Sequence, residues 1–398
     1  MTDNNLFDFA FFGAVPYDHL LRGRTGAFVD VLRRIGYYVY YFEIPPASVL
    51  QYVKEPTFHK RGLINFFSPP IKIQPNLAVF AFPPIIPASR FESGYIRTFN
   101  TKRFVQRIKK YYYPLVRERK KPVVAIIVTP YWFDIISELN FSLICYDCID
   151  DVKVFCKEKH LNYFINLQRK LIEKSDLVII SAEKLKDDIL AINSQKPITY
   201  IPNGVAFDFF SEHKNDSQIA DSLLSFKRPI IGFVGAIFNW IDITLIKKTA
   251  ETFSDCSVVL VGPVQDVKIP TLPNLHYLGV KPFSSIPAII NAFDVCLIPF
   301  VAGEVSDKVD PIKIYEYLAL GKPVVAINLP ELKRMASLIY FAESKDDFIN
   351  AIRKALNENS AELRTLRIKF AQENSWEHRV KKLIEAVSNR ITCSEKQK

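Results

Sequence analysis

The segment that begins at Asp310 carries residue types suited to binding an anion together with a pair of hydroxyl groups. Asp310 is a favourable helix N-cap and Pro311 suits the first helical position, so the spacing predicts a helix over 312–320. Free amides and the positive dipole end attract anions there, and Lys313 adds a cation. Glu316 lies one turn later on the same face, where its carboxylate could accept hydrogen bonds from two vicinal hydroxyls. This helix could therefore bind a diphosphate and a ribose, or it could be a packing helix with Lys313 and Glu316 as a surface pair.

Three carboxylates, those of Asp147, Asp150 and Asp151, follow a strand-like apolar run at 141–146. Carboxylates this close disfavour full ionisation together, which raises the pKa of one of them. Such a group suits a general base that takes a proton from an acceptor hydroxyl, with Asp150 the first choice and Asp147 the second. The alternative is an acidic turn that caps the next helix.

Two further sets of residues stand where strands of the first half end. Arg22 and Arg24, in the loop after the first strand, have the chemistry to bind an acceptor pyrophosphate, or they form a basic loop on the rim. Tyr131 and Trp132 suit stacking against a sugar and equally suit simple packing.

Alternating strand-like and helical stretches must position these residues. Glycines at 36 and 321 stand where helices should end. The helical stretches lie at 26–35, 161–174, 286–292 and 312–320. The strand-like runs lie at 7–12, 37–42, 77–82, 123–128, 141–146 and 177–181, and then at 230–234, 258–261, 275–278, 295–299 and 324–327. This order is typical of parallel sheets covered by helices on both faces.

The pattern restarts after a polar, acidic stretch at 211–222, which indicates two domains. We predict an α/β fold of two Rossmann-like, doubly wound parallel-sheet domains that face a cleft. The boundaries are an N-terminal acceptor domain over 1–204, a linker over 205–228 and a C-terminal donor domain over 229–374. A ligand is expected at the carboxyl ends of the strands.

The charge is unevenly distributed along the 398 residues, whose formal net charge is +10. Between Arg97 and Lys121 there are ten Lys or Arg residues against one acid, Glu118, with aromatic residues interleaved. Such a stretch favours peripheral contact with an anionic membrane, although a solvated helix face would look the same. Nucleic acid is not expected, because no known nucleic-acid-binding motif accompanies the basic stretch.

The cysteines and the N-terminus favour a cytoplasmic location. Several of the six cysteines lie in apolar runs, as reduced thiols do, and the N-terminus lacks the basic-then-apolar pattern of a signal peptide. Cys145 and Cys148 have CxxC spacing, but no second pair accompanies them, so we expect no metal site.

The segment Lys313-Ile-Tyr-Glu-Tyr-Leu-Ala-Leu-Gly-Lys-Pro-Val-Val325 resembles the donor-binding helix of GT-B glycosyltransferases, in particular teichuronic-acid and exopolysaccharide transferases. Other segments agree in order: Pro202-Asn-Gly-Val205, Gly232-Phe-Val-Gly235-Ala236, Asn274-Leu-His-Tyr-Leu-Gly279-Val-Lys-Pro-Phe283, Asp294-Val-Cys-Leu-Ile-Pro-Phe300 and Ser375-Trp376-Glu377. The resemblance implies a GT-B fold whose last helix, 375–392, crosses back to the first domain. It also implies a donor site made by Glu316, Lys313, Ile312, Ile314, Tyr315, Gly235, Gly279, Lys281 and Phe283.

The sequence departs from this family at one informative position. Many retaining relatives carry two glutamates eight positions apart, whereas the partner position of Glu316 is Lys308. The family usually works without a bound metal, and no Asp-x-Asp motif stands in an obvious place.

The resemblance implies transfer of a sugar from a nucleotide diphosphate sugar, with UDP as the expected nucleotide. The acceptor would be a hydroxyl of a glycan or of a lipid-linked molecule, in cell-surface polysaccharide synthesis. Neither a cofactor nor a metal is expected. The alternatives are a nucleotide-sugar epimerase or hydrolase on the same fold and a non-catalytic membrane-associated scaffold. A nicotinamide dehydrogenase is disfavoured, because no Gly-x-Gly-x-x-Gly follows either first strand.

Overall fold

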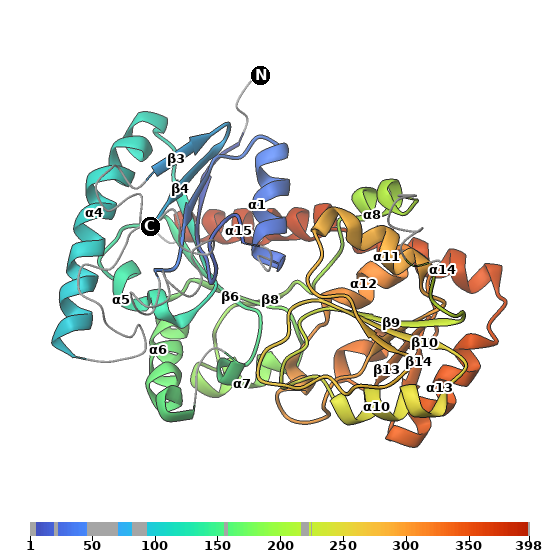
Figure 1. Ribbon diagram of the computed structural model, residues 1–398. Coiled ribbons are helices and arrows are strands. Elements are labelled where there is room, and N and C mark those ends of the chain that lie inside the picture. Colours follow the sequence, from blue (N-terminus) through green and yellow to red (C-terminus); the bar gives the residue numbers. More distant parts are fainter. Residues whose placement is uncertain are drawn as a thin grey trace. The chain divides into compact units, whose positions relative to one another are not determined.

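The computed structural model describes residues 5–19, 23–45, 71–81, 94–154, 158–215, 223 and 225–396. The chain divides into two compact units (Figure 1). The first comprises Met1–Pro202 and Val380–Lys398, and the second comprises Asn203–Arg379. The expected linker therefore contributes structure to the second unit, because helix α8 (Phe207–His213) lies within it.

The first unit is built on an eight-stranded sheet with the order β3-β4-β2-β1-β5-β6-β7-β8. Its strands are β1 (Asp8–Phe12), β2 (Val39–Phe42), β3 (Ile71–Gln74), β4 (Leu77–Phe80), β5 (Val123–Ile127), β6 (Leu143–Cys148), β7 (Leu177–Ile180) and β8 (Ile198–Tyr200). Neighbours pair in parallel except β3 and β4, which are antiparallel. Every residue of β1, β2, β5 and β6 is buried, as continuous apolar runs require when helices cover both faces of a sheet.

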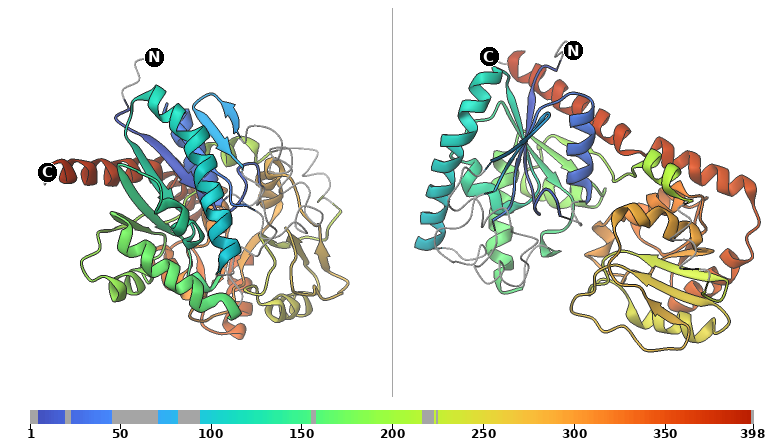
Figure 2. Two further views of the ribbon diagram at one scale, coloured as in Figure 1. Left: turned by 90° about the vertical axis from the view of Figure 1, so that its left-hand side faces the viewer. Right: turned by 45° about the horizontal axis from the view of Figure 1, so that its top comes forward.

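The helices of the first unit lie on both faces of this sheet. They are α1 (Gly23–Arg34), α4 (Tyr95–Arg119), α5 (Phe133–Ile136), α6 (Leu161–Lys174), α7 (Leu185–Ile192) and the part of α15 (Trp376–Lys396) that begins at Val380, with short 3-10 turns η1 (Pro130–Trp132), η2 (Val152–Val154) and η3 (Glu158–His160). Helices α1 and α4 cover opposite faces (Figure 2). No helix in the described ranges combines the length and apolar character needed to cross a membrane.

The second unit is built on a six-stranded, fully parallel sheet with the order β11-β10-β9-β12-β13-β14. Its strands are β9 (Ile230–Val234), β10 (Ser257–Val261), β11 (Leu275–Tyr277), β12 (Val295–Ile298), β13 (Val324–Ile327) and β14 (Tyr340–Ala342). Its helices are α8, α10 (Ile243–Thr252), α11 (Ile286–Ala292), α12 (Ile312–Ala319), α13 (Lys345–Leu356) and α14 (Ala361–Glu373), with turns η4 (Phe283–Ser285), η5 (Ser306–Lys308) and η6 (Pro330–Met335).

These two sheets confirm the predicted fold class of two Rossmann-like parallel-sheet domains. Both expected helix terminators have positive φ angles, +94° at Gly36 and +69° at Gly321. The antiparallel strand β3 and the edge strands β8 and β14 were not predicted. Residue 82, the last of one predicted strand, lies outside the described residues.

The prediction that Asp310 caps the helix that follows is wrong. The N-cap of α12 is Pro311, and no side chain makes a capping hydrogen bond. The Asp310 carboxylate instead accepts hydrogen bonds from the Asn203 amide, the Tyr315 hydroxyl and Arg334. Tertiary partners outcompete the local cap because they supply a charged donor and two neutral ones to a fully buried carboxylate.

Candidate active site

Helix α12 presents a cation and a carboxylate near its start. Lys313 Nζ lies 2.7 Å from Glu316 Oε2. The Glu316 side chain is only 6% exposed, whereas that of Lys313 is 29% exposed. The pair that the sequence placed on one face is therefore formed, between a buried carboxylate and a partly exposed ammonium.

Buried side chains of α12 anchor the helix in the second unit. Ile314, Tyr315 and Tyr317 are completely buried, and the Val234 amide at the end of β9 donates a 2.9 Å hydrogen bond to the Tyr317 hydroxyl. Ile312 is partly exposed. Since the side chains of Ile314 and Tyr315 fill the core, contact of either residue with a ligand would have to come from the backbone.

Three glycine turns meet where β9, β10 and β11 end. Gly235 follows β9, Gly262 follows β10 and Gly279 follows β11. The Gly235 amide donates a hydrogen bond to the Val261 carbonyl, and the Gly262 amide donates one to the Gly279 carbonyl, each 2.9 Å long. A Cβ on Gly262 would stand 1.9 Å from the Gly235 carbonyl oxygen, and φ is +135° there. A side chain is thus excluded at Gly262, and the partly exposed Gly235 and Gly279 present backbone at the carboxyl edge of the sheet.

The loop after Gly279 places Lys281 and Phe283 differently. Lys281 is partly exposed. Phe283 is 45% exposed, and its ring stacks on Phe209 of α8 with centroids 5.0 Å apart and planes 10° apart. This stack fixes an aromatic surface beside the glycine turns.

Lys308 stands in η5, two residues before Asp310. Its side chain is only 12% exposed, and its ammonium lies 3.9 Å from the Glu304 carboxylate. The position that is acidic in many retaining relatives therefore holds a largely buried cation.

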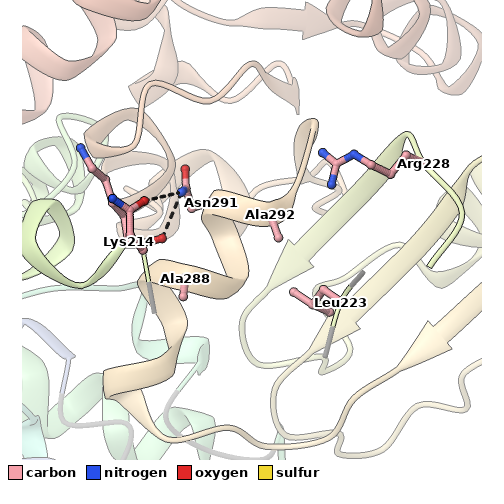
Figure 3. Close-up of a pocket in the computed structure, with 7 residues that line it drawn as sticks. Lys214, Leu223, Arg228, Ala288, Asn291 and Ala292 are labelled. Atoms are coloured by element: carbon pink, nitrogen blue, oxygen red, sulfur yellow. Dashed lines mark hydrogen bonds between the residues drawn. The ribbon is translucent and has the colours of Figure 1, made fainter. Parts of the chain in front are cut away.

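A pocket of about 330 Å³ lies in the second unit, away from α12 and the glycine turns (Figure 3). It is lined by Lys214, Asn215, Leu223, Arg228, Ala288, Asn291 and Ala292. Arg228 precedes β9, so this hollow is at the amino edge of the sheet, opposite the glycine turns, and the Arg228 guanidinium is paired with Asp294 at 2.6 Å. We therefore do not assign the candidate donor site to it.

The acidic loop begins at the carboxyl end of β6 in the first unit. Asp147, the fifth residue of that strand, is buried and accepts two 3.1 Å hydrogen bonds from Arg24. Asp151 is also buried, and its carboxylate accepts from the Lys153 amide at 2.9 Å. Both carboxylates therefore have fixed partners.

Asp150 lies between them and is only partly exposed. Burial raises its pKa from 3.8 to about 6, Arg24 opposes this rise, and the neighbouring charges of Asp147 and Asp151 add to it. The expected effect of crowded carboxylates is present, but burial is its larger cause. A carboxyl with this pKa is ionised near neutral pH and basic enough to accept a proton.

The expected acceptor-binding residues have varied surroundings. Arg22 lies outside the described residues. Arg24 is buried, paired with Asp147, and donates to the Ile201 carbonyl at 2.7 Å. Trp132 is 2% exposed and donates from Nε1 to the Gly13 carbonyl, so it fixes the loop after β1.

Tyr131 is likewise buried, at 7% exposure, with the Arg97 guanidinium 5.1 Å from its ring centre. Both thiols of the CxxC pair are buried in β6, and burial raises the pKa of Cys148 to about 12, which disfavours the reactive thiolate. Sequence reasoning missed Asn203 and Arg334 as partners of Asp310. Only the Pro202-Asn-Gly-Val205 motif gave a signal for the first of them.

Comparisons with known proteins show what this chain resembles. The model of the glycosyl transferases group 1 family matches residues 228–358, the stretch that holds the glycine turns and α12. A Bacillus subtilis protein described as a teichuronic acid biosynthesis glycosyltransferase, TuaH, is 29% identical over 269 residues. That match covers 61% of this chain and 66% of TuaH, so the chain spans just under two thirds of this relative.

Solved structures share the fold over nearly the whole chain. Sucrose-phosphate synthase from Thermosynechococcus elongatus matches with a TM-score of 0.68 at 12% identity, over 97% of this chain and 100% of that one. Anabaena HepE in complex with UDP and glucose matches with a TM-score of 0.67 at 13% identity, over 96% and 99%. An E. coli trehalose-6-phosphate enzyme bound to UDP-2-fluoro glucose matches with a TM-score of 0.66 at 12% identity, over 96% and 99%. The chain is thus similar to group 1 glycosyltransferases over residues 228–358, and it shares the GT-B fold with these solved structures.

Proposed function

We propose that this protein transfers a sugar from a nucleotide diphosphate sugar, with UDP as the nucleotide, to a hydroxyl of a glycan or lipid-linked acceptor in cell-surface polysaccharide synthesis. The observation that carries the proposal is the pairing of Lys313 and Glu316 on α12 within the region that matches the family model. TuaH, by its description, acts in teichuronic acid synthesis, and the HepE and E. coli structures hold UDP or a UDP-sugar.

The donor would lie across the carboxyl edge of the second sheet. Glu316, whose buried carboxylate is held by Lys313, would accept charge-assisted hydrogen bonds from the ribose hydroxyls. Lys313 is exposed enough to turn its ammonium toward the diphosphate, beside the first amides of α12. Gly235 and Gly279 leave room for the nucleotide, and the loop with Lys281 and Phe283 would border the base. Stabilising the charge on the leaving diphosphate is then the task of Lys313 and the helix start.

The acceptor would lie at the acidic loop of the first unit, with Asp150 as general base. Its raised pKa and its freedom from the pairs that occupy Asp147 and Asp151 support this choice. Asp147 then serves to hold Arg24 rather than to take the proton. Arg22 remains the proposed contact for an acceptor phosphate, and the buried Tyr131 and Trp132 would shape the acceptor loop from beneath.

The test of the donor site is a thermal-shift screen of UDP, GDP and their sugars against wild type and Glu316→Gln. A ligand at about 100 times its Kd stabilises the native state by roughly 2.7 kcal/mol. We expect a shift with a uridine nucleotide that Glu316→Gln abolishes. The matched control is Glu251→Gln, because Glu251 also pairs with a lysine on a helix of the second unit, at 3.5 Å.

Each outcome of this screen is informative. A uridine shift that survives Glu316→Gln would overturn the ribose assignment, and no shift with any nucleotide would overturn the donor site. Turnover of a UDP-sugar without an acceptor would favour the hydrolase alternative.

We further propose that α4 contacts an anionic membrane. One side of this helix buries Phe104, Val105, Ile108 and Tyr112 in the first unit. The solvent side carries exposed cations, and Tyr95 and Phe99 stand exposed at its start, at 97% and 40%. The exposed cations are Lys102, Arg103, Lys109, Lys110, Arg117 and Lys120. Cations beside exposed aromatic rings match the interfacial zone of an anionic bilayer.

The test is co-sedimentation with vesicles of phosphatidylglycerol or of phosphatidylcholine. Binding to the anionic vesicles alone, weakened by salt and by Lys109→Glu with Lys110→Glu, supports the proposal. Equal binding to both vesicles, or none to either, would refute it. Lys247→Glu with Lys248→Glu, a double reversal on the second unit, is the control for net charge.

A further inference from the structure

The chain passes between the two units at two places, after Pro202 and after Arg379. Within the second unit these places are tied together. Arg379 Nε donates a 2.9 Å hydrogen bond to the Asn203 carbonyl, and its guanidinium also bonds the Asn374 side chain. The Trp376 amide donates to the Val205 carbonyl at 3.0 Å. Hydrogen bonds within the second unit therefore join the two crossings directly.

The first crossing is also fastened to the start of the donor helix. The Asn203 amide donates to Asp310 Oδ2 at 2.6 Å, and Asn203 Nδ2 donates to the Asp310 carbonyl at 2.6 Å. Tyr315 and Arg334 also donate to this carboxylate, which is 0% exposed. Asp310 therefore connects the first crossing to α12, which begins two residues later at Ile312.

In the first unit, Ile201 at the same crossing is connected through Arg24 to the acidic loop that holds Asp147 and Asp150. Arg24 NH1 donates to the Ile201 carbonyl at 2.7 Å, and the remainder of its guanidinium grips Asp147 through two 3.1 Å bonds. Both side chains are 1% exposed. Asp147 stands three residues before Asp150. Residues 201–203 therefore carry a buried charged clamp on each side.

We propose that these clamps form a relay, in which Asp310 and Arg24 are positioning residues that couple donor binding at α12 to the setting of the acidic loop. The inference rests on the proposed function, since it takes the donor to bind at the start of α12. Charge-assisted hydrogen bonds in a dry interior are strong and directional, and only Pro202 lies between the two clamped residues, Ile201 and Asn203. A ligand that shifts the start of α12 would shift Asn203 through Asp310 and reach Asp147 through Ile201 and Arg24.

Hydrogen exchange with UDP as the probe tests the relay in the full-length protein. In wild type, we expect UDP to slow exchange of the amides at 201–205 and at 147–154, by about tenfold, within the usual range of site coupling. Asp310→Asn and Arg24→Lys each keep a polar side chain but break one clamp. Both should remove the UDP-dependent protection at 147–154 while UDP still binds.

The control is Glu358→Gln, which weakens a buried Arg367–Glu358 pair of the second unit whose hydrogen bonds involve neither crossing. This variant should keep the protection. UDP binding without protection at 147–154 in wild type, or loss of it in the control as well, overturns the relay and leaves the proposed function standing. Failure of wild type to bind any nucleotide diphosphate overturns the donor site and the relay together.

Discussion

Replacement of Asp150 by asparagine should remove activity and, at neutral pH, make the protein more stable. Burial raises the pKa of this carboxyl from 3.8 to about 6, so the folded protein tolerates its charge poorly. Between these values the folded state binds more protons at Asp150 than the unfolded state does. Stability contributed by this group is therefore fully present below about pH 4 and is lost as the pH rises through 6.

The magnitude follows from the same two values. The difference between 3.8 and about 6 corresponds to about 3 kcal/mol at pH 7.5. Asp150→Asn lacks the charge, so its free energy of unfolding should exceed that of wild type by up to this amount at pH 7.5. The difference between the two free energies of unfolding should disappear near pH 4. The other titratable groups are the same in both proteins, so their contributions to the free energy of unfolding cancel in the difference.

The activity of the wild type should follow the ionised fraction of Asp150. We expect kcat to be half-maximal near pH 6 and about one tenth of its plateau at pH 5, since a general base works only when ionised. Asp150→Asn should lower kcat by about 10²- to 10⁴-fold. The assays are release of the nucleotide diphosphate and urea unfolding, each measured from pH 4.5 to pH 8.

The matched control is Asp134→Asn, a carboxylate of the same unit that pairs with Arg97 at 2.8 Å near the surface. It should leave the pH profile unchanged. A flat profile between pH 5 and pH 7.5 in wild type would refute the base assignment. An Asp150→Asn protein that is less stable than wild type at pH 7.5 would refute the burial argument.

Three other substitutions test the packing that supports the site, each measured by urea unfolding. Gly262→Ala should cost more than about 2 kcal/mol, because its Cβ would stand 1.9 Å from a backbone oxygen at a φ of +135°; full stability would mean that the glycine turns are not in contact. Phe283→Ala should cost about 1 kcal/mol through loss of the stack on Phe209, and no loss would show that the rings are apart. Arg119→Leu should cost about 3–5 kcal/mol, because it leaves the buried Asp8 carboxylate without its bidentate partner; a neutral effect would contradict that pairing.

Much of the fold could be predicted from the sequence because a strand buried on both faces must be apolar along its whole length. The run at 123–128 and the run at 230–234 therefore appear directly as β5 and β9. The helix at 312–320 could also be predicted, because a glycine follows it and its polar residues fall one turn apart. In the structure Gly321 has the positive φ that ends such a helix. Edge strands such as β14 are short and only partly buried, so their pattern is weak.

The sequence by itself determined the two parallel sheets, the Lys313 and Glu316 pair and the acidic loop, because each is encoded by neighbours along the chain. Only the tertiary structure decided which charges meet. Arg24 and Asp147 are 123 residues apart, and Asn203 and Asp310 are 107 apart. Asp310 reads locally as a helix cap, yet the folded chain surrounds it with donors from distant segments. Burial and charge pairing depend on how the elements close upon one another, and the spacing of residues within a single element does not contain that information.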